Sequence, residues 1–290
     1  MKENITQPVP KLGHSCYLDM ISTSSSPEAK ANAARRYAEM MIDLFLSEKA
    51  KERLGEDKFK KLGLGDQIKE IRNDFNKEVV DALFNIKNIG DRGSHYSPDK
   101  QLSEEEVNKI SKTALGLFTL ILIDYFKKNR FDKTIMTPTI FSTLFPEVRA
   151  NVLSRLLNNG ILTEDYDKGI LHKYILALVK SRKTDKAKKL LENKYKKGLI
   201  EIDFYKQEED SILQIEEGMK KEELPVPKKI NDCKRNFDAV INSLDQDERI
   251  KNKELIKIIS TLLHEISPSE FGSSIPNKRY PVQVYFNIED

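Results

Sequence analysis

Apolar residues recur at the three- and four-residue spacing of amphipathic helices over most of the chain. Two helix starts are marked by their capping residues. Ser26 precedes Pro27 at the first helical position, and Ser103 is followed three residues later by Glu106, the pattern of a capping box. We therefore predict an all-α fold. Helices are expected over residues 27–45, 67–84 or beyond, 103–128, 146–158, 165–181, 184–197, 205–221, 230–244 and 252–266.

The breaks between these patterns suggest how the chain is organised. Prolines and a serine run predict an irregular arm over residues 1–25, and the Gly, Asp and Ser content of 88–100 predicts a turn rather than a helix interior. Residues 165–197 are typical of an antiparallel helical hairpin, and two prolines predict a stiff linker near 222–229. The end, 280–288, alternates like a strand. The predicted division is an arm over 1–25, a helical bundle over 26–132, and a mostly helical C-terminal domain with a short strand over 133–290.

The composition is that of a very polar folded protein. Of 290 residues, 39% are hydrophobic and 33% charged, which provides enough apolar material for about two domains with cores of their own. The chain has 49 Lys and Arg against 46 Asp and Glu. The resulting net charge of +3 is too small to indicate nucleic-acid binding by bulk charge, so such a role would need a local patch.

Other functional classes lack their sequence signals. Cys16 and Cys233 are far apart and neither belongs to a C-x-x-C motif, which argues against a zinc site or a disulfide framework and favours a reducing compartment. The N-terminus has no apolar segment of the signal-peptide kind. The longest apolar stretch, 114–126, is interrupted by Asp124 and is too short to cross a bilayer. We expect a cytoplasmic protein without membrane association, metal or cofactor.

One pair of neighbouring segments has strongly opposed charge. Residues 180–197 hold nine basic and two acidic side chains, and residues 201–223 hold nine acidic and three basic ones. The basic segment could bind nucleic acid through Lys186, Lys188 and Lys189. Alternatively, the two segments form adjacent helices whose opposite charges pair on a solvated face.

The first domain resembles a known family at three places. The first is the helix start Ser26–Ala29 with the following Ala34–Glu39, the second is the segment Ile86–His95, and the third is the acidic, capped start of the last apolar helix. These features are similar to the HEPN superfamily of helical domains, over roughly residues 26–129, and in particular to the uncharacterised prokaryotic subgroup often fused to restriction and defence proteins. The resemblance implies a bundle that forms a homodimer and an RNA-directed role in a prokaryotic defence or toxin-type system.

The resemblance also implies roles for individual residues. Active HEPN ribonucleases cleave RNA without a metal, using a His as acid and base and an Arg that holds the phosphate. Here these would be His95 and Arg92, with Lys87 as a second phosphate-binding residue, and Asp91 or Ser94 to orient the imidazole. Two residues separate Arg92 from His95 and seven separate Lys87 from it, and neither spacing is that of the active members.

The residues themselves leave two interpretations of this segment open. In one, backbone N–H groups around Gly90 and Gly93 form an anion-binding nest beside Arg92 and His95. In the other, Asp91 pairs with Arg92, and His95 is a structural residue of the turn. The corresponding functions are a metal-independent endoribonuclease and a non-catalytic dimerisation or interaction module that binds a protein or a nucleotide-like ligand.

Overall fold

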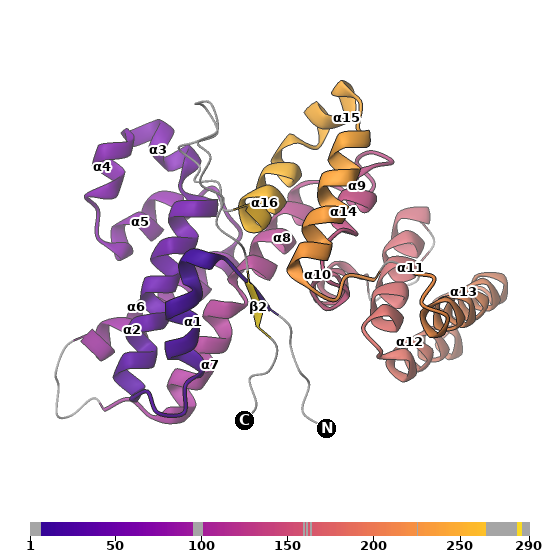
Figure 1. Cartoon of the computed structure of the whole chain (residues 1–290), viewed down its shortest axis with the longest axis horizontal. Coiled ribbons are helices and arrows are strands. Elements are labelled where there is room, and N and C mark those ends of the chain that lie inside the picture. Colours follow the sequence, from indigo (N-terminus) through magenta and orange to yellow (C-terminus); the bar gives the residue numbers. More distant parts are fainter. Residues whose placement is uncertain are drawn as a thin grey trace. The chain divides into compact units, whose positions relative to one another are not determined.

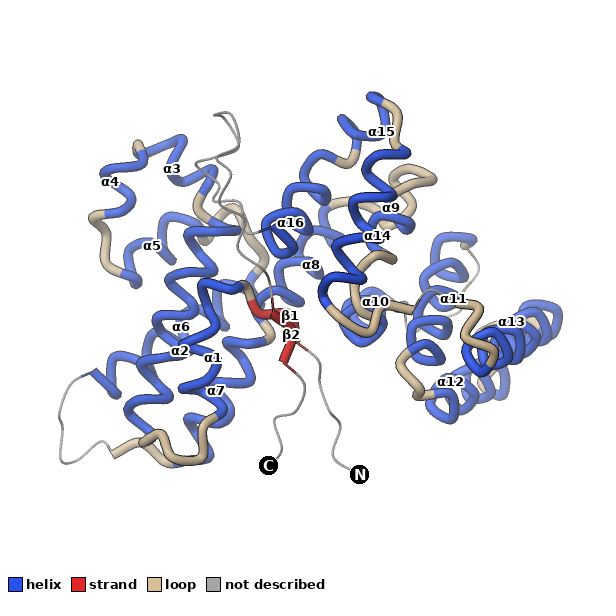
Figure 2. The backbone as a smooth tube through the Cα atoms, in the orientation of Figure 1, coloured by secondary structure: helices blue, strands red, loops and turns tan. Residues whose placement is uncertain are grey.

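Almost every regular element of the chain is a helix. The computed structural model describes residues 7–94, 101–158, 160, 162, 164–224, 226–264 and 283–285. Within them lie sixteen α-helices and two short strands, so the predicted all-α class is confirmed (Figures 1 and 2). None of the helices in this part of the chain is both long and apolar enough to cross a membrane.

The chain divides into two compact units, Met1–Asp124 with Lys257–Asp290, and Tyr125–Ile256. The first contains α1 (His14–Ile21), α2 (Pro27–Met41), α3 (Glu48–Leu54), α4 (Glu56–Lys60), α5 (Leu64–Ile71), α6 (Lys77–Ser94) and α7 (Glu104–Leu115). The second contains α9 (Thr137–Phe141), α10 (Pro146–Leu156), α11 (Asp165–Lys180), α12 (Thr184–Lys196), α13 (Ile202–Lys220), α14 (Ile230–Ser243) and α15 (Gln246–Lys251). The boundaries fall inside α8 (Leu117–Lys128) and α16 (Lys253–His264).

This division differs from the one predicted at residues 132 and 133, because the end of the chain returns to the first unit. Strand β2 (Gln283–Tyr285) pairs antiparallel with β1 (Gln7–Val9), with Val284 opposite Pro8. Lys257 of α16 also forms an ion pair with Glu48. The strand predicted over 280–288 is therefore present at its centre, and its partner lies at the other end of the chain.

The expectation of an irregular N-terminal arm is wrong for residues 7–21. They form β1, a 3-10 turn at Lys11–Gly13 and α1, which packs on α2. Tyr17 and Met20 of α1 are buried. Helix α1 is short, and its apolar side is recognisable only once α2 is there to cover it.

Helix α2 is the centre of the first unit. It packs against α1, α6 and α7, and its Tyr37 and Met41 are fully buried. The start predicted from Ser26 and Pro27 is confirmed, because the Ser26 hydroxyl accepts a hydrogen bond from the Ala29 N–H at 3.2 Å. A π-helical turn, Ile42–Leu46, follows α2 and leads to α3.

Two further predicted boundaries are corrected. The helix predicted over 67–84 is two helices, because Asn76 caps a new start: its side-chain oxygen accepts from the Val79 N–H at 3.1 Å. Its own N–H donates to the buried carboxylate of Asp124 at 2.7 Å. The helix predicted over 103–128 is likewise two helices, because α7 ends and α8 begins on either side of Gly116. The helix predicted over 252–266 is found as α16, from Lys253 to His264 within the described residues.

The predicted turn over 88–100 is wrong for residues 88–94, which belong to α6. The glycines serve close helix packing. A Cβ atom on Gly90 would lie 2.6 Å from Cβ of Arg35, and one on Gly93 would lie 2.9 Å from Cβ of Ala31. Only residues without a side chain let α6 approach α2 this closely, so the glycines are needed inside the helix despite their low helix propensity.

The second unit contains the predicted helical hairpin. Helices α11 and α12 are in contact and are joined by three residues, of which Arg182 has a positive φ of 59°. A connection this short makes the helices antiparallel. Helix α12 ends at Lys196, and Gly198 follows with a φ of 66°; the Leu199 N–H donates to the Lys194 carbonyl at 3.0 Å. Helix α13 packs against both.

Candidate functional site

The last two turns of α6 carry most of the residues predicted to bind phosphate. Lys87 Nζ lies 2.6 Å from Oδ2 of Asp91, one turn along the same helix. The other carboxylate oxygen of Asp91 lies 3.2 Å from Nη1 of Arg35 on α2. Arg35 also approaches Glu39 of its own helix, with Nε 3.4 Å from Oε1. The carboxylate of Asp91 is thus shared by two cations, and Lys87 is already paired.

Arg92 contacts a different helix. Its Nη1 donates to Glu106 Oε1 at 2.7 Å and its Nη2 to the Gln101 carbonyl at 3.2 Å. Glu106 is the third helical residue of the capping box of α7, and Oε2 accepts from both the N–H and the hydroxyl of Ser103. Arg92 first, and the Ser103 groups second, lower the pKa of Glu106 to about 2. Arg92 therefore joins the end of α6 to the start of α7.

The expected pairing of Asp91 with Arg92 is wrong. Consecutive residues of a helix point in directions about 100° apart, so their side chains do not face each other. Asp91 consequently pairs across to α2, and Arg92 pairs across to α7. The nest expected around Gly90 and Gly93 is also absent from this part of the structure, because both residues are helical and face α2.

Ser94 is the last residue of α6 and connects this end of the helix to α2. Its hydroxyl lies 2.5 Å from Oδ1 of Asn32 and 3.0 Å from the Gly90 carbonyl. The amide nitrogen of Asn32 donates to the Gly93 carbonyl at 3.2 Å. The Ser94 hydroxyl and the Asn32 amide therefore both form hydrogen bonds at the C-terminal turn of α6. His95 lies outside the described residues, so the orientation of its imidazole by Asp91 or Ser94 stays a prediction.

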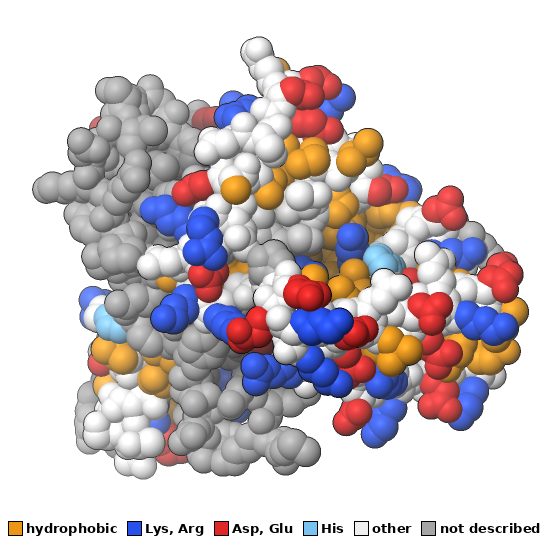
Figure 3. Space-filling view, turned by 45° about the vertical axis from the view of Figure 1, so that its right-hand side comes forward, with side chains coloured by type: hydrophobic (Ala, Val, Ile, Leu, Met, Phe, Trp, Pro, Cys, Tyr) orange, Lys and Arg blue, Asp and Glu red, His pale blue; other side chains and the backbone are white. Residues whose placement is uncertain are grey.

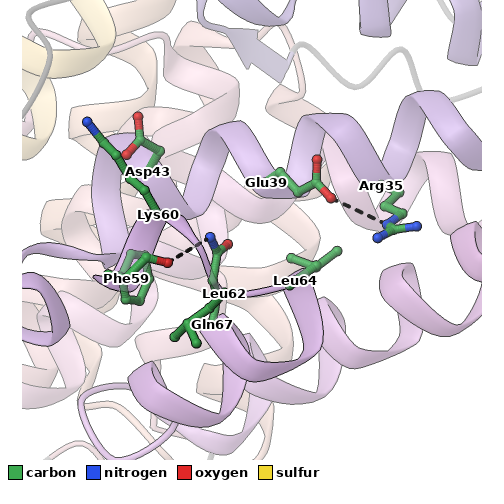
Figure 4. A pocket seen from close by; sticks show the side chains of 9 residues that line it. Arg35, Glu39, Asp43, Phe59, Lys60, Leu62, Leu64 and Gln67 are labelled. Atoms are coloured by element: carbon green, nitrogen blue, oxygen red, sulfur yellow. Dashed lines mark hydrogen bonds and ion pairs between the residues drawn. The ribbon is translucent and has the colours of Figure 1, made fainter. Parts of the chain in front are cut away.

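A pocket of about 390 Å³ lies beside Arg35, between α2 and the α4–α5 segment. Figure 4 shows Arg35 and Glu39 on one wall and Phe59, Lys60 and Gln67 on the facing side. The remaining lining residues are Asp43, Leu62, Gly63 and Leu64. The Gln67 side-chain amide donates to the Phe59 carbonyl at 3.5 Å, which connects α5 to α4.

The charges around this pocket are mixed. Arg35 contributes a cation whose side chain is 28% exposed, and Glu39 and Asp43 contribute carboxylates from the following turns of the α2 segment. Two of the charged lining residues also pair outside the lining: Lys60 with Glu56 at 2.6 Å, and Asp43 with Lys51 at 2.5 Å. Hydrogen-bond donors and acceptors therefore converge on one volume that also has apolar walls.

The basic segment predicted to bind nucleic acid lies on α12. Lys188 pairs with Glu216 of α13 at 3.3 Å, and Lys186 and Lys189 are exposed. The rings of Tyr195 and Tyr205 are 4.7 Å apart, which adds a second contact between these helices. Figure 3 shows basic and acidic side chains interspersed over the helices at its right-hand side. Lys188 therefore forms the ion pair expected if the opposite charges of the two adjacent helices pair on a solvated face.

No family model, curated protein or solved structure matches the chain. The similarity to HEPN domains therefore stays a prediction. Sequence reasoning missed two features of this site: the position of Arg35 between the α6 end and the pocket, and the pocket itself. The only sequence signal was the pair of glycines in α6, whose partners on α2 are about 60 residues away along the chain.

Proposed function

We propose that the chain is a non-catalytic binding module whose first unit takes a nucleotide-like ligand in the pocket beside Arg35. The observation that carries this proposal is the pocket itself, since 390 Å³ lies within the range of small-molecule sites, roughly 300–1,000 Å³. It combines an apolar wall with a few polar groups from separate elements, which is the usual composition of such sites. HEPN-like self-association and a role in defence belong to the same proposal.

The lining groups fit the parts of a nucleotide. The guanidinium of Arg35 is partly exposed at the pocket wall, and its ion pairs with Glu39 and Asp91, at 3.4 and 3.2 Å, are longer than those of Lys87 and Arg92. A phosphate can therefore compete for the Arg35 guanidinium more readily than for Lys87 or Arg92. The carboxylates of Glu39 and Asp43 can accept hydrogen bonds from ribose hydroxyl or base amino groups. Phe59 and Leu64 supply apolar surface for a base. Arg35 is positioned by Asp91 and packs against Gly90, which makes the end of α6 the support of this site.

The end of α6 itself supports a structural role better than a catalytic one. Lys87 and Arg92 each face a carboxylate within 2.7 Å, and an incoming phosphate would have to displace Asp91 or Glu106. Such displacement removes an interaction for each one it makes, so the net gain in binding free energy is small.

Isothermal titration of the full chain with adenosine and uridine 5′-monophosphates tests the pocket. Arg35→Met keeps the aliphatic stem against Gly90 and removes the charge. We expect it to weaken binding by about tenfold or more. Arg36→Met is the matched control, because Arg36 is the exposed neighbour on the same helix, and it should bind like the wild type. No binding of either nucleotide by the wild-type chain, or equal loss in both variants, would contradict the proposal.

A second candidate function is the metal-independent endoribonuclease. One observation favours it: the Arg92 side chain is 30% exposed and lies in the last turn of α6, three residues before His95 in the sequence. Incubation with total RNA in EDTA, beside His95→Ala and Arg92→Ala, tests this function. An enzyme requires that the wild type cleaves and that both variants lose cleavage, whereas Arg72→Ala, an exposed arginine elsewhere in the unit, retains it. Absence of cleavage by the wild type supports the binding module.

A further inference from the structure

Arg149 is a buried cation in the middle of α10. The residue is 7% exposed, and its Nε is buried without a hydrogen-bond partner. Within the part of the chain that the structure describes, no carboxylate forms an ion pair with its guanidinium. Buried charges in proteins are normally paired, because transfer of an ion out of water is expensive unless a partner compensates it. We therefore expect an anion to compensate the charge of Arg149.

Two lysines face the same space. Lys173 and Lys180 lie seven residues apart on α11, which is about two helical turns, so they share one face of that helix. With Arg149 they line a cavity of about 40 Å³, closed on other sides by Phe131, Phe141 and Ser142. Three cations thus surround this cavity, and none of the described residues that line it carries a carboxylate. The Ser142 hydroxyl donates to the Pro138 carbonyl at 2.6 Å.

Burial disfavours the charged forms of all three cations, and neighbouring positive charges add to this effect for the two lysines. Burial first lowers the pKa of Arg149, to about 10. Burial and then the charge of Arg149 lower the pKa of Lys173, and burial, Arg149 and Lys173 lower that of Lys180. The acidic groups that act on them are Glu147 and the Cys233 thiol for Arg149, and Glu208 for Lys173. Glu208 already bonds the His172 imidazole at 2.9 Å.

We propose that this cavity between α10 and α11 binds a phosphate-sized oxyanion through Arg149, Lys173 and Lys180. A planar guanidinium matches two oxygens of such an anion, and the two ammonium groups approach the others as point charges. The volume of the cavity limits the size of the anion that it can hold. A water molecule needs about 10–15 Å³ on this scale, so 40 Å³ holds a group of a few heavy atoms but not a nucleobase.

The anion can be free phosphate or the phosphoryl group of a monoester whose remainder lies outside the cavity. In both cases the binding chemistry is the same. This site belongs to the second unit and uses none of the residues of the Arg35 pocket, so it does not rest on the function proposed above.

Thermal unfolding of the full chain is the test, with sodium phosphate, sodium sulfate or adenosine 5′-monophosphate added against sodium chloride of equal ionic strength. Binding to the folded state raises Tm with ligand concentration by mass action. We expect phosphate and sulfate to raise Tm. The monophosphate arm is run in Arg35→Met, in which the nucleotide pocket lacks its phosphate-binding charge. If the monophosphate raises Tm there as well, the source includes monoesters, and if it does not, the source is the free anion.

Variants of the three cations make the test specific. Arg149→Met fills the same space without charge, and we expect the phosphate response to fall by about tenfold or more in apparent affinity. The double substitution Lys173→Met with Lys180→Met, at half-buried positions, should weaken the phosphate response in the same way. It replaces Arg149→Met as the test variant if Arg149→Met fails to fold. Arg155→Met, an exposed arginine of α10, is the matched control and should respond like the wild type.

Two results would overturn the proposal. One is an equal effect of phosphate, sulfate and chloride at matched ionic strength on the wild type. The other is a phosphate response that persists in Arg149→Met and in the double lysine variant. Arg35→Met should keep the whole phosphate response of this site, so that failure of the nucleotide pocket and failure of this site are told apart.

Discussion

The end of α6 and the middle of α10 both concentrate cations, and the two regions treat them differently. At the end of α6, Lys87 and Arg92 each meet a carboxylate, and Arg35 meets two. At α10, Arg149 is more deeply buried, has no carboxylate partner among the residues that the structure describes, and faces two lysines. The ion pairs Arg35–Asp91 and Arg92–Glu106 join neighbouring helices, whereas for the buried cluster around Arg149 we propose a bound anion as the partner. Local charge density by itself therefore does not identify a binding site.

The largest expected effect comes from separating α6 from α2. Gly90→Ala places a Cβ 2.6 Å from Cβ of Arg35, so one helix must shift and the Arg35–Asp91 pair is disturbed. We expect a loss of about 1–3 kcal/mol in the free energy of unfolding. Gly169→Ala in α11 is the control: nothing lies within 4 Å of its Cβ, so the better helix propensity should stabilise by about 0.5–1 kcal/mol. Urea denaturation measures both, and equal effects would contradict the packing role of Gly90.

The next effect compares the two regions directly. Without added anion, Arg149→Met removes an uncompensated buried charge and should raise the free energy of unfolding by about 1 kcal/mol or more. Arg92→Met breaks a paired contact between α6 and α7 and should lower it. Urea denaturation in a phosphate-free buffer gives both values. A lower stability for Arg149→Met would show that its charge is compensated within the chain.

A smaller effect appears in the pH dependence. Because the pKa of Glu106 in the folded chain is about 2, below its ordinary value of 4.5, its contribution to stability is present above about pH 4.5 and disappears as the pH falls towards 2. Glu106→Gln keeps the capping-box side chain but not the charge. We expect the variant to lose less stability than the wild type between pH 5 and 2. Parallel acid titrations followed by circular dichroism would show the difference. Identical curves would show that the Arg92–Glu106 ion pair does not contribute to stability in this pH range.

The smallest effect is expected on α12. Reversal of Lys186, Lys188 and Lys189 to Glu leaves RNA affinity unchanged if these lysines form a solvated face, as the pairing of Lys188 with Glu216 indicates. A single substitution, Lys188→Gln, should change the free energy of unfolding by less than about 1 kcal/mol. Filter binding of RNA at several salt concentrations checks the first point. A weaker RNA affinity with a flatter salt dependence would instead indicate that these lysines bind nucleic acid.

These comparisons also show which parts of the structure the sequence could predict. The helix starts at Ser26 and Ser103 depend on residues three positions apart, and both are found in the structure. The role of Gly90 depends on Arg35, which is distant in sequence, so the same glycines are compatible with a turn or with close helix packing. Strand β2 was predicted from its alternation, but its partner, Gln7–Val9, is too short to be recognised alone.

The anion site was not predicted from the sequence, although a signal for Arg149 exists. Its neighbours on the helix, Val148, Val152 and Leu153, are all buried, so Arg149 occupies the apolar side of α10. An arginine at such a position indicates a buried charge. What compensates the charge depends on α11, and no local pattern identifies that helix as its neighbour. Sequence periodicity can thus locate a buried cation, and only the packed structure shows whether a carboxylate or a cavity faces it.

The most direct test of the contrast between the two regions is the phosphate dependence of the unfolding midpoint in Arg92→Met and Arg149→Met, measured side by side at constant ionic strength. We predict that phosphate stabilises Arg92→Met as much as it stabilises the wild type and does not stabilise Arg149→Met. Retention of the phosphate effect in Arg149→Met, or its loss in Arg92→Met, would contradict the proposed anion site.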